Sequence, residues 1–564
     1  MLKRYSTMST AWVGDLRFRS PLTGAQAKAI LARLKVETEA KAMLRDLFMY
    51  TVFMVAVVVM TYGHMDVYYR YMQTKYTREL LVGAQSYVDE EEHSQWLEKI
   101  HYVSDIWDYL VDTLVPQLLP DQPELAQSYN SYLVGPIRVR QVRVEPDHSS
   151  CDSSFNVYGG LRNVFGHQFC TYSLNEGQEE KRSFNHTWSM PSSLPADEMQ
   201  DSPYVYRSAE ELRTLPFKGH HGWYPGGGYV TVLPRDNAQI AETILLELSK
   251  SDWIDQMTRC ILVELTMYNP NVHLFTNVRL SFEFENYGGI FPMKSFFTSQ
   301  LFHYTEEKKV WLQYAEAITV LCVVFYTFVE VKSMLRLGIR QYFSDIWNWT
   351  EILVLLVSYT SGLFFFLRYS ARLEVFSLFR KYGHSRFIDF SLAFFRDEEL
   401  QVSLGLLAAL VIYKMLKIIT FNPFLATFTH TIFLSRADCI GYSAMTAAYL
   451  VAFGIFGMLS FGSKLIGYYS FDRALLRLFF FIMGEPDFHK LVAANYAMGH
   501  LFFLSALFVT QYIIINFFIA ILREWLNIAR CLTYNEENAT LAYMIQSLKL
   551  YLGLGPKNVR RITN

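Results

Sequence analysis

Apolar residues in this 564-residue chain are gathered into runs that are long enough to cross a lipid bilayer. A helix needs roughly 20 mostly apolar residues for that purpose. Charged residues make up 18% of the chain, below the roughly 25% of an ordinary soluble protein, while hydrophobic residues make up 51%. The chain is therefore predicted to be an integral membrane protein in contact with lipid, and its net charge of −2 favours no nucleic-acid partner.

Six predicted spans divide the chain unequally, because residues 64–302 contain no run that is long enough to cross a bilayer. A basic flank before the first span places the N-terminus in the cytosol, and an even number of spans returns the chain there. The segment between the first and second spans is therefore predicted to lie outside. The predicted spans are 47–63, 311–331, 347–367, 400–419, 438–461 and 498–526.

A shorter apolar stretch, residues 471–483, lies between the fifth and sixth spans and is followed by Gly484-Glu485-Pro486-Asp487. It is too short to cross, and non-helical backbone at membrane depth is tolerated only where it is buried in protein or lines a wet cavity. Six spans with a re-entrant segment before the last are the layout of a tetrameric, voltage-gated-channel-like cation channel. We therefore predict an α-helical membrane protein with six transmembrane helices and a re-entrant pore loop.

The outer segment is predicted to be an extracellular α+β domain. Alternating polar and apolar residues at 137–144 and 278–284 predict half-buried strands, and residues 238–256 predict a helix. Three consecutive glycines, Gly226 to Gly228, lack the context of a phosphate-binding loop, so we expect them to allow close backbone packing.

The spans and the outer segment together define six parts of the chain. The tail is predicted to be short, with neither an EF-hand calcium loop nor sustained heptads. In chain order the predicted parts are a cytosolic N-terminus (1–45), the first transmembrane helix (46–64), the extracellular domain (65–302), transmembrane helices two to four with a linker (303–436), the pore domain (437–528) and the cytosolic tail (529–564).

One group of basic residues opposes this topology, because it lies in the predicted outer loop before the fourth span. Basic residues usually gather on the cytosolic side of a membrane protein, but the first helix dominates this tendency, so we keep the assignment. The residues are Arg368, Arg372, Arg380, Lys381, Arg386 and Arg396.

Several motifs, spread along the chain in order, carry a family resemblance. The chain resembles the polycystin-2 type of transient-receptor-potential cation channel over nearly its whole length. The resemblance implies a homotetramer or a heterotetramer with other polycystin subunits, in which four polycystin domains cover a pore for Na⁺, K⁺ and Ca²⁺. The matching stretches are 135–141, 253–255, 268–275, 288–290, 343–348, 414–422 and 516–521.

The resemblance places the selectivity filter at Gly484 and Glu485, with Asp487 close behind. An acidic ring concentrates cations and replaces part of their hydration shell, and Ca²⁺ requires several oxygen ligands. Ca²⁺ is thus expected as a permeant ion at Glu485 and Asp487, with no tightly bound cofactor. Pro486 departs from the family pattern and should stiffen the loop. The alternative is an ordinary surface turn between two helices.

Two lysines in the fourth span, Lys414 and Lys417, are three residues apart and so share a helix face. Charges inside a membrane usually have partners, and the resemblance points to Glu330 and Glu351 as voltage-sensor-like acidic sites. Two lysines imply weak voltage dependence. The alternative is a set of static ion pairs, or lysines that reach the cytosolic edge.

The last span would line the pore, and the resemblance places an apolar gate at Ile519 that could close by dewetting. Arg523 lies one turn further, where the family usually has a small polar residue. Four arginines at an inner mouth would repel cations, which favours a mixed tetramer or weak conduction. The alternative is that Arg523 only marks the cytosolic interface, where basic residues are common.

Two covalent features are expected in the outer domain. Cys151 and Cys170 are the predicted disulfide, because the family has a cysteine pair in this region, although Cys260 could compete. Asn185 begins an Asn-His-Thr glycosylation motif on the side of the membrane where it could be modified.

Three functions remain open from the sequence: a conducting non-selective cation channel, an accessory subunit of a mixed polycystin channel, and a receptor without channel activity. An enzyme is not expected, because no nucleophile–base pair or metal cluster stands out in the sequence. The plasma membrane, the cilium and the endoplasmic reticulum are all compatible locations.

Overall fold

The structure is a computed structural model, and it separates into two compact units. One consists of residues 53–411, and the other combines residues up to 52 with those from 412 onwards. Each unit is described by itself. The structure describes residues 24–83, 96–119, 130–147, 170–171, 178–189, 202–220, 222–285, 288–301, 310–344, 346–419, 423–484 and 488–534.

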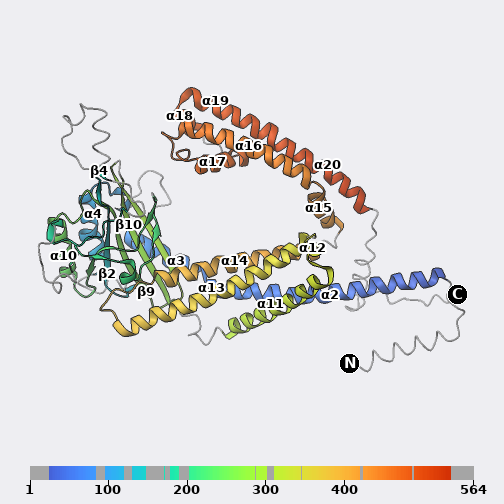
Figure 1. Ribbon diagram of the computed structural model, residues 1–564, viewed down its shortest axis with the longest axis horizontal. Coiled ribbons are helices and arrows are strands. Elements are labelled where there is room, and N and C mark those ends of the chain that lie inside the picture. The colour runs from blue at the N-terminus through green and yellow to red at the C-terminus, as the bar shows by residue number, and fades with distance from the viewer. Residues whose placement is uncertain are drawn as a thin grey trace. The chain divides into compact units, whose positions relative to one another are not determined.

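An antiparallel sheet forms the outer domain of the first unit, in the strand order β11-β10-β9-β2-β8-β5, with β1 paired to β9 (Figure 1). The long strands are β2 (Ile137–Arg143), β8 (Gly228–Leu233), β9 (Thr258–Asn269), β10 (Leu274–Phe284) and β11 (Ile290–Ser299). The short strands of this sheet are β1 (Tyr132–Leu133) and β5 (Tyr206–Arg207). Two separate pairs are formed by β3 (Pro146–Asp147) with β4 (Cys170–Thr171) and by β6 (Phe217–Lys218) with β7 (Trp223–Tyr224).

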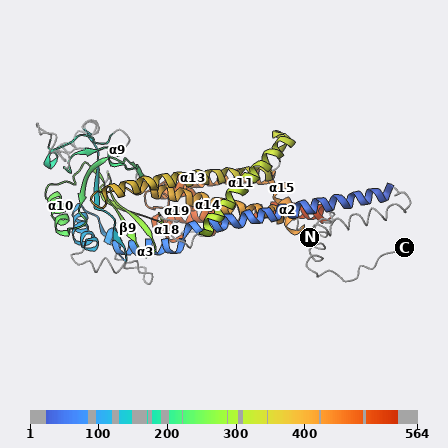
Figure 2. The same cartoon turned by 90° about the horizontal axis from the view of Figure 1, so that it is seen from below.

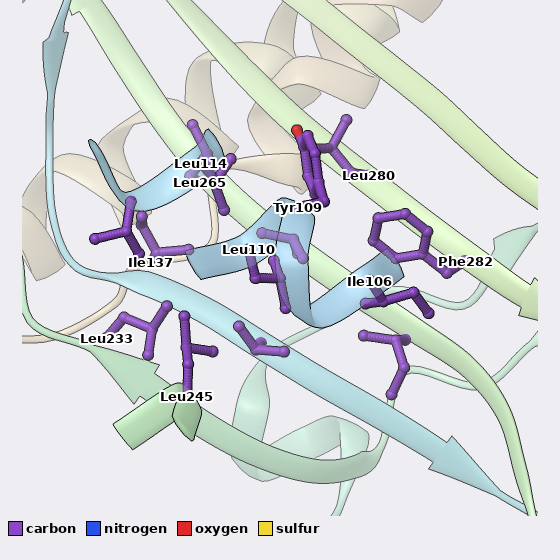
Figure 3. Packing of buried hydrophobic residues seen from close by; sticks show 14 of the residues in the cluster. Ile106, Tyr109, Leu110, Leu114, Ile137, Leu233, Leu245, Leu265, Leu280 and Phe282 are labelled. Atoms are coloured by element: carbon purple, nitrogen blue, oxygen red, sulfur yellow. The ribbon is translucent and has the colours of Figure 1, made fainter. Parts of the chain in front are cut away.

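Helices cover one face of this sheet and enclose the main hydrophobic core. Figure 3 shows Tyr109, Leu110 and Leu114, from the helical segment 103–118, in one buried cluster with Ile137, Leu265 and Leu280 of the sheet. The expected α+β character is thus present in the described residues. The helices of this domain are η2 (Trp96–Lys99), α4 (Val103–Asp108), the π-helical η3 (Tyr109–Leu114), α5 (Val115–Leu118), η4 (His186–Trp188), α9 (Ala209–Leu212) and α10 (Ala238–Lys250).

Long helices extend from the sheet, and α13 and α14 lie side by side in two perpendicular views (Figures 1 and 2). Buried residues of both helices, among them Ala371 and Phe394, share one cluster with Phe275 of the sheet. The long helices are α2 (Gly24–Met65), α3 (Val67–Val82), α11 (Val310–Leu337), α13 (Ile346–Tyr382) and α14 (Ser391–Ile419), and the short helix α12 (Ile339–Tyr342) follows α11.

Five helical segments among the described residues are long and apolar enough to cross a membrane. The fourth predicted span, 400–419, lies within α14, which is not one of the five. The six-span layout therefore stays a prediction. The five are Leu44–Val82, Val310–Leu337, Trp347–Tyr382, Arg436–Phe461 and Tyr496–Leu532.

The basic residues before the fourth span do not form a loop, contrary to the prediction. Helix α13 continues to Tyr382, so most of them lie on it, whereas Arg396 lies on α14 and Arg386 in the connection between them. Arg368 is buried, with its guanidinium 3.1 Å from the Asp397 carboxylate. Charge pairing between neighbouring helices therefore accounts for part of this basic group.

Strand β2 was predicted to be half-buried, and this is wrong: every residue from Ile137 to Arg143 is buried. The alternating arginines do not face water, because each has an acidic partner. Arg138 donates to Glu264 at 2.8 Å, and Arg143 donates to Asp255 at 2.6 and 2.8 Å. An alternating pattern can thus arise when one face of a strand is apolar and the other is ionic.

The glycine-rich segment packs closely against β2, as expected. A Cβ on Gly228 would lie 2.4 Å from the Gln141 carbonyl oxygen, so only glycine fits there. The Arg140 guanidinium donates to the carbonyl oxygens of residues 225, 226 and 227 at 2.9, 3.0 and 2.9 Å. The close approach of the backbone thus provides hydrogen-bond acceptors for a fully buried arginine.

Glu264 lies at the centre of the ionic face of the sheet. It contacts Arg138, Arg140 and Arg279, with nitrogen–oxygen distances of 2.6, 3.4 and 3.3 Å. Burial alone would raise the pKa of the Glu264 carboxyl, but the three guanidinium charges lower it well below its ordinary value. The carboxylate is therefore ionised at neutral pH.

We expect Glu264→Gln to lower the free energy of unfolding of the outer domain by about 3–5 kcal/mol, because it leaves buried guanidinium charges uncompensated. Urea unfolding of the purified chain, followed by tryptophan fluorescence, would measure the loss. Glu242→Gln is the matched control, since Glu242 is exposed on α10 and should change stability by less than about 0.5 kcal/mol. Equal losses of unfolding free energy in both variants would contradict the role of Glu264 as the counter-charge of the buried arginines.

Candidate pore

The second unit contains a short helix between two long ones, in the order predicted for a pore. Helix α17 has the predicted bounds, Phe471–Met483, and follows α16. The elements of this unit, besides parts of α2 and α14, are α15 (Pro423–Leu434), α16 (Arg436–Phe461), α17 (Phe471–Met483), α18 (Phe488–Ala494), α19 (Tyr496–Leu507), the π-helical η6 (Phe508–Ile514) and α20 (Ile515–Tyr534).

Helix α17 is held by its apolar face. Ala474, Leu478 and Phe481 are buried in one cluster, and the Phe481 ring lies 6.2 Å from that of Phe502 on α19. Phe502 also contacts Phe461, at the end of α16, with ring centroids 5.4 Å apart. One aromatic side chain therefore joins the two long helices to the short helix between them.

Two glycines in α16 allow this close packing. A Cβ on Gly457 would lie 3.0 Å from the Tyr468 ring and 3.3 Å from Phe502, and a Cβ on Gly454 would lie 3.1 Å from Leu475. These are tighter than ordinary contacts, so a larger side chain at Gly454 would separate α16 from α17, and one at Gly457 would displace Tyr468 and Phe502. Sequence reasoning did not single out this pair, although its spacing of three residues places both glycines on one helix face.

The predicted filter begins where α17 ends. Gly484 has a left-handed backbone, with φ 90° and ψ 20°, and its amide N–H donates to carbonyls of the last helical turn. This conformation suits glycine and turns the chain out of the helix. Glu485, Pro486 and Asp487 lie outside the described residues, so the acidic ring stays a prediction.

The last predicted span is divided by the π-helical turn η6, which sequence reasoning missed. The Tyr442 hydroxyl of α16 donates to the Ile514 carbonyl at 3.1 Å, and the buried Thr510 hydroxyl donates to the Ala506 carbonyl at 2.8 Å. A π-helical turn disturbs the regular backbone ladder, and such turns are frequent at functional sites. The polar residues Thr510 and Gln511 inside an apolar span were the available signal.

The two predicted gate residues lie on an exposed face of α20. Ile519 is 54% exposed, and Arg523, four residues later, is exposed as well. Residues spaced by four share a helix face. The Trp525 indole donates to Asp438 of α16 at 2.7 Å. This bond ties the lower part of α20 to α16 within the same chain.

The voltage-sensor-like residues have contacts of their own. Lys414 is buried, with its ammonium 4.5 Å from the centre of the Tyr50 ring, which is a cation–π contact. The Lys417 side chain lies outside the described residues. Glu330 accepts a hydrogen bond from the Tyr342 hydroxyl, and Glu351 is buried on α13. Their roles in voltage sensing stay predictions.

A buried carboxylate that sequence reasoning missed connects the bases of several helices in the first unit. Asp397 of α14 accepts from Arg70 of α3 at 2.9 Å and from Arg368 of α13 at 3.1 Å. It also accepts from Ser299 of β11 at 2.7 Å and from Gln401 at 2.6 Å. This carboxylate thus accepts hydrogen bonds from three other segments of the chain and from Gln401 on its own helix.

Comparison with known proteins agrees with this division into an outer domain and a helical part. A family model described as Polycystin domain matches residues 96–302, and one described as Polycystin cation channel matches residues 303–528. This chain belongs to the polycystin cation channel family. That family is one of cation channels and not of enzymes, and it agrees with the resemblance predicted from the sequence.

Curated relatives in this family match most of the chain. Polycystin-2-like protein 1 of Homo sapiens is 27% identical over 529 residues, which cover 91% of this chain and 60% of the relative. Polycystin-2 of Danio rerio is 26% identical over 532 residues, which cover 91% of this chain and 54% of the relative. Polycystin-2 of Caenorhabditis elegans is 26% identical over 452 residues, 78% of this chain and 58% of the relative. The chain thus spans little more than half the length of these polycystins.

The predicted covalent features lie in the polycystin domain. Cys151 and the side chain of Cys170 lie outside the described residues, so the disulfide stays a prediction. Cys260, the competing candidate, is a free and fully buried thiol in β9, and burial raises its pKa. Asn185 lies just before η4, half-buried, with its backbone N–H donating to the Ser189 carbonyl at 2.9 Å. Its glycosylation stays a prediction.

We expect Gly484→Ala to destabilise the purified chain by about 1–2 kcal/mol, because alanine is strained in the left-handed conformation. Gly441→Ala is the matched control. Gly441 lies inside α16 with open space around its Cα, so alanine there should stabilise the chain by about 0.5–1 kcal/mol. The midpoints of thermal unfolding should fall for Gly484→Ala and rise for Gly441→Ala. Shifts of the same sign in both variants would contradict the left-handed turn at Gly484.

Proposed function

We propose that this chain is a subunit of a tetrameric, non-selective cation channel that conducts Na⁺, K⁺ and Ca²⁺. The observation that carries the proposal is the short helix α17, packed between α16 and α19 and ended by left-handed Gly484. Such a helix can enter the bilayer without crossing it, because its packing partners belong to the same chain. Membership of the polycystin cation channel family supports this reading.

The acidic residues after Gly484 would form the filter. In a tetramer, four copies of Glu485 and Asp487 would converge around the axis and attract cations electrostatically. Carboxylate and carbonyl oxygens would replace part of the hydration shell of Ca²⁺. The turn at Gly484 supports this arrangement, because it ends the helix immediately before the acidic residues.

The exposed face of α20 would line the lower pore. Ile519 and Arg523 lie on this face, and a large exposed apolar side chain such as Ile519 is suited to a contact with other subunits. A ring of four Ile519 side chains could close the pore by excluding water. The π-helical turn η6 lies between this face and α19, so it provides a place where the gate can rotate.

An accessory role is the second candidate, and the exposure of Arg523 favours it. Four Arg523 guanidiniums near a narrow inner mouth would repel permeant cations. In a mixed tetramer with other polycystin-family subunits, fewer arginines would face the pore. This chain would then change the selectivity of its partners without conducting on its own.

We expect Glu485→Gln to reduce the Ca²⁺ permeability relative to Na⁺ by about two- to tenfold, because it removes the charge that concentrates divalent cations. Reversal potentials and single-channel currents of the chain in planar bilayers would measure the change. Glu242→Gln, on the exposed face of α10, is the control and should leave both unchanged. Identical permeability in the wild type and Glu485→Gln would argue against the proposed filter.

We expect Arg523→Asn to increase single-channel conductance by about twofold or more, because it removes four positive charges from the inner mouth. Arg523→Lys keeps the charge and is the matched control, with conductance close to that of the wild type. If the wild type is silent alone and alters the currents of a polycystin-2 partner, the accessory role holds. If Arg523→Asn conducts no better than Arg523→Lys, Arg523 does not face the pore.

A further inference from the structure

A cavity of about 350 Å³ lies between the sheet of the outer domain and the far end of α13, entirely within the first unit. This volume falls in the range of sites for small organic ligands. Nothing in the predicted pore uses this cavity. Its lining is mainly aromatic and includes Tyr132, Tyr268, Phe275, Phe376, Phe379 and Phe390.

The aromatic wall is already packed and ordered by its own contacts. Phe275 is 7% exposed and stacks on Phe390, which is 2% exposed, with ring centroids 5.9 Å apart. The ring centroids of Tyr268 and Phe275 are 4.4 Å apart, and the Tyr268 hydroxyl is 3.0 Å from a ring nitrogen of His273. A ligand that enters would therefore meet a preformed apolar surface and would not need to open a core.

One cationic side chain, Arg235, lines the cavity. It follows β8 and is half-buried, and among the residues that the structure describes it makes no ion pair. A planar guanidinium is well suited to bidentate binding of a carboxylate or a similar oxyanion. The cavity thus combines a large aromatic surface with a single anion-binding group.

The surroundings of the cavity are also positive. Arg386 lines a smaller adjoining cavity that shares Phe379 and Phe390 with the larger one. Two nearby acids already have partners, since Glu374 of α13 pairs with Arg213 at 3.5 Å and Asp389 pairs with Arg138 at 3.1 Å, whereas Asp236, next to Arg235, is exposed to water. The two arginines that line the adjoining cavities therefore favour an anion over a cation.

The position along α13 indicates that the ligand arrives from water. The apolar run of this helix ends near Leu367, and Phe376 and Phe379 lie nine and twelve residues later. If the hydrocarbon layer ends with the predicted span at Leu367, then at 1.5 Å per residue they lie about 14 and about 18 Å beyond it. An acyl chain that remains in the bilayer would not reach the cavity.

We propose that this cavity binds a small amphipathic organic anion, with its aromatic or aliphatic body among the phenylalanines and its carboxylate or sulfonate on Arg235. The ligand would contact the sheet, α13 and Phe390, which directly precedes α14. It would therefore hold the outer domain and two membrane helices in one arrangement. The proposal concerns binding and holds whether or not the chain conducts.

Equilibrium dialysis of the full chain in phosphatidylcholine nanodiscs would test the proposal with 2-naphthoate as the probe. Its neutral analogue 2-naphthalenemethanol reports the aromatic contribution alone, and empty nanodiscs correct for partition into lipid. The variants are Arg235→Gln, Arg235→Lys and Phe379→Ala. Lys250→Gln is the control, because Lys250 is an exposed cation at the end of α10 in the same domain.

We expect saturable binding of 2-naphthoate that Arg235→Gln weakens about tenfold or more, as loss of a charged hydrogen bond does. The affinity of Arg235→Lys for 2-naphthoate should stay within about threefold of that of the wild type. The neutral analogue should bind Arg235→Gln and the wild type with equal affinity. Phe379→Ala should weaken both probes about equally, by roughly tenfold. Unchanged elution and melting of the variants would show that they are folded.

Three results would overturn the proposal. Binding no greater than that of empty nanodiscs would mean that lipid alone takes up the probe. Equal affinity of the wild type, Arg235→Gln and Lys250→Gln would mean that Arg235 does not recognise the charge. Exclusion of the probe from assembled chains, with a Phe379→Cys variant cross-linking between copies, would mean that a neighbouring copy fills the cavity. None of these readouts depends on current, so they are independent of the channel assay.

Discussion

The polycystin domain depends on one buried carboxylate. Glu264 lies in the middle of the sheet and compensates arginines from two neighbouring strands, β2 and β10. Without it, the ionic face of the sheet would leave several buried guanidiniums without a counter-charge. The opposite face is then largely apolar and packs against α10 and η3. The register of the central strands is thus fixed twice, once by packing and once by charge.

A second buried carboxylate, closer to the predicted spans, also joins several elements. Asp397 joins α3, α13, α14 and β11 through four side chains, as Glu264 joins strands. Because α3, α13 and α14 continue into apolar segments or lie next to them, this carboxylate lies where the outer domain meets the predicted spans. Helix positions in this region are therefore set by directional bonds as well as by apolar contact, which packs helices with less specificity.

Local patterns in the sequence predicted the short helix α17 with its correct bounds, because an amphipathic run ended by Gly484 is a strong local signal. They also located β2 and β10. They failed for the exposure of β2, because the partners of its arginines lie more than a hundred residues away. The extension of α13 to Tyr382 was missed for a related reason: Arg368 is buried through Asp397, 29 residues further along. Pairing at such separations leaves no local pattern.

The link between Arg138 and Asp389 has a mechanical consequence. Arg138 binds Glu264 within the sheet and Asp389 in the connection that leads into α14, with its guanidinium 4.1 Å from the Phe387 ring. Tension applied to the outer domain would thus reach the top of α14 through one shared guanidinium. Since these ion pairs are shielded from water, salt weakens them little. A displacement of the sheet would therefore be transmitted to the start of that helix.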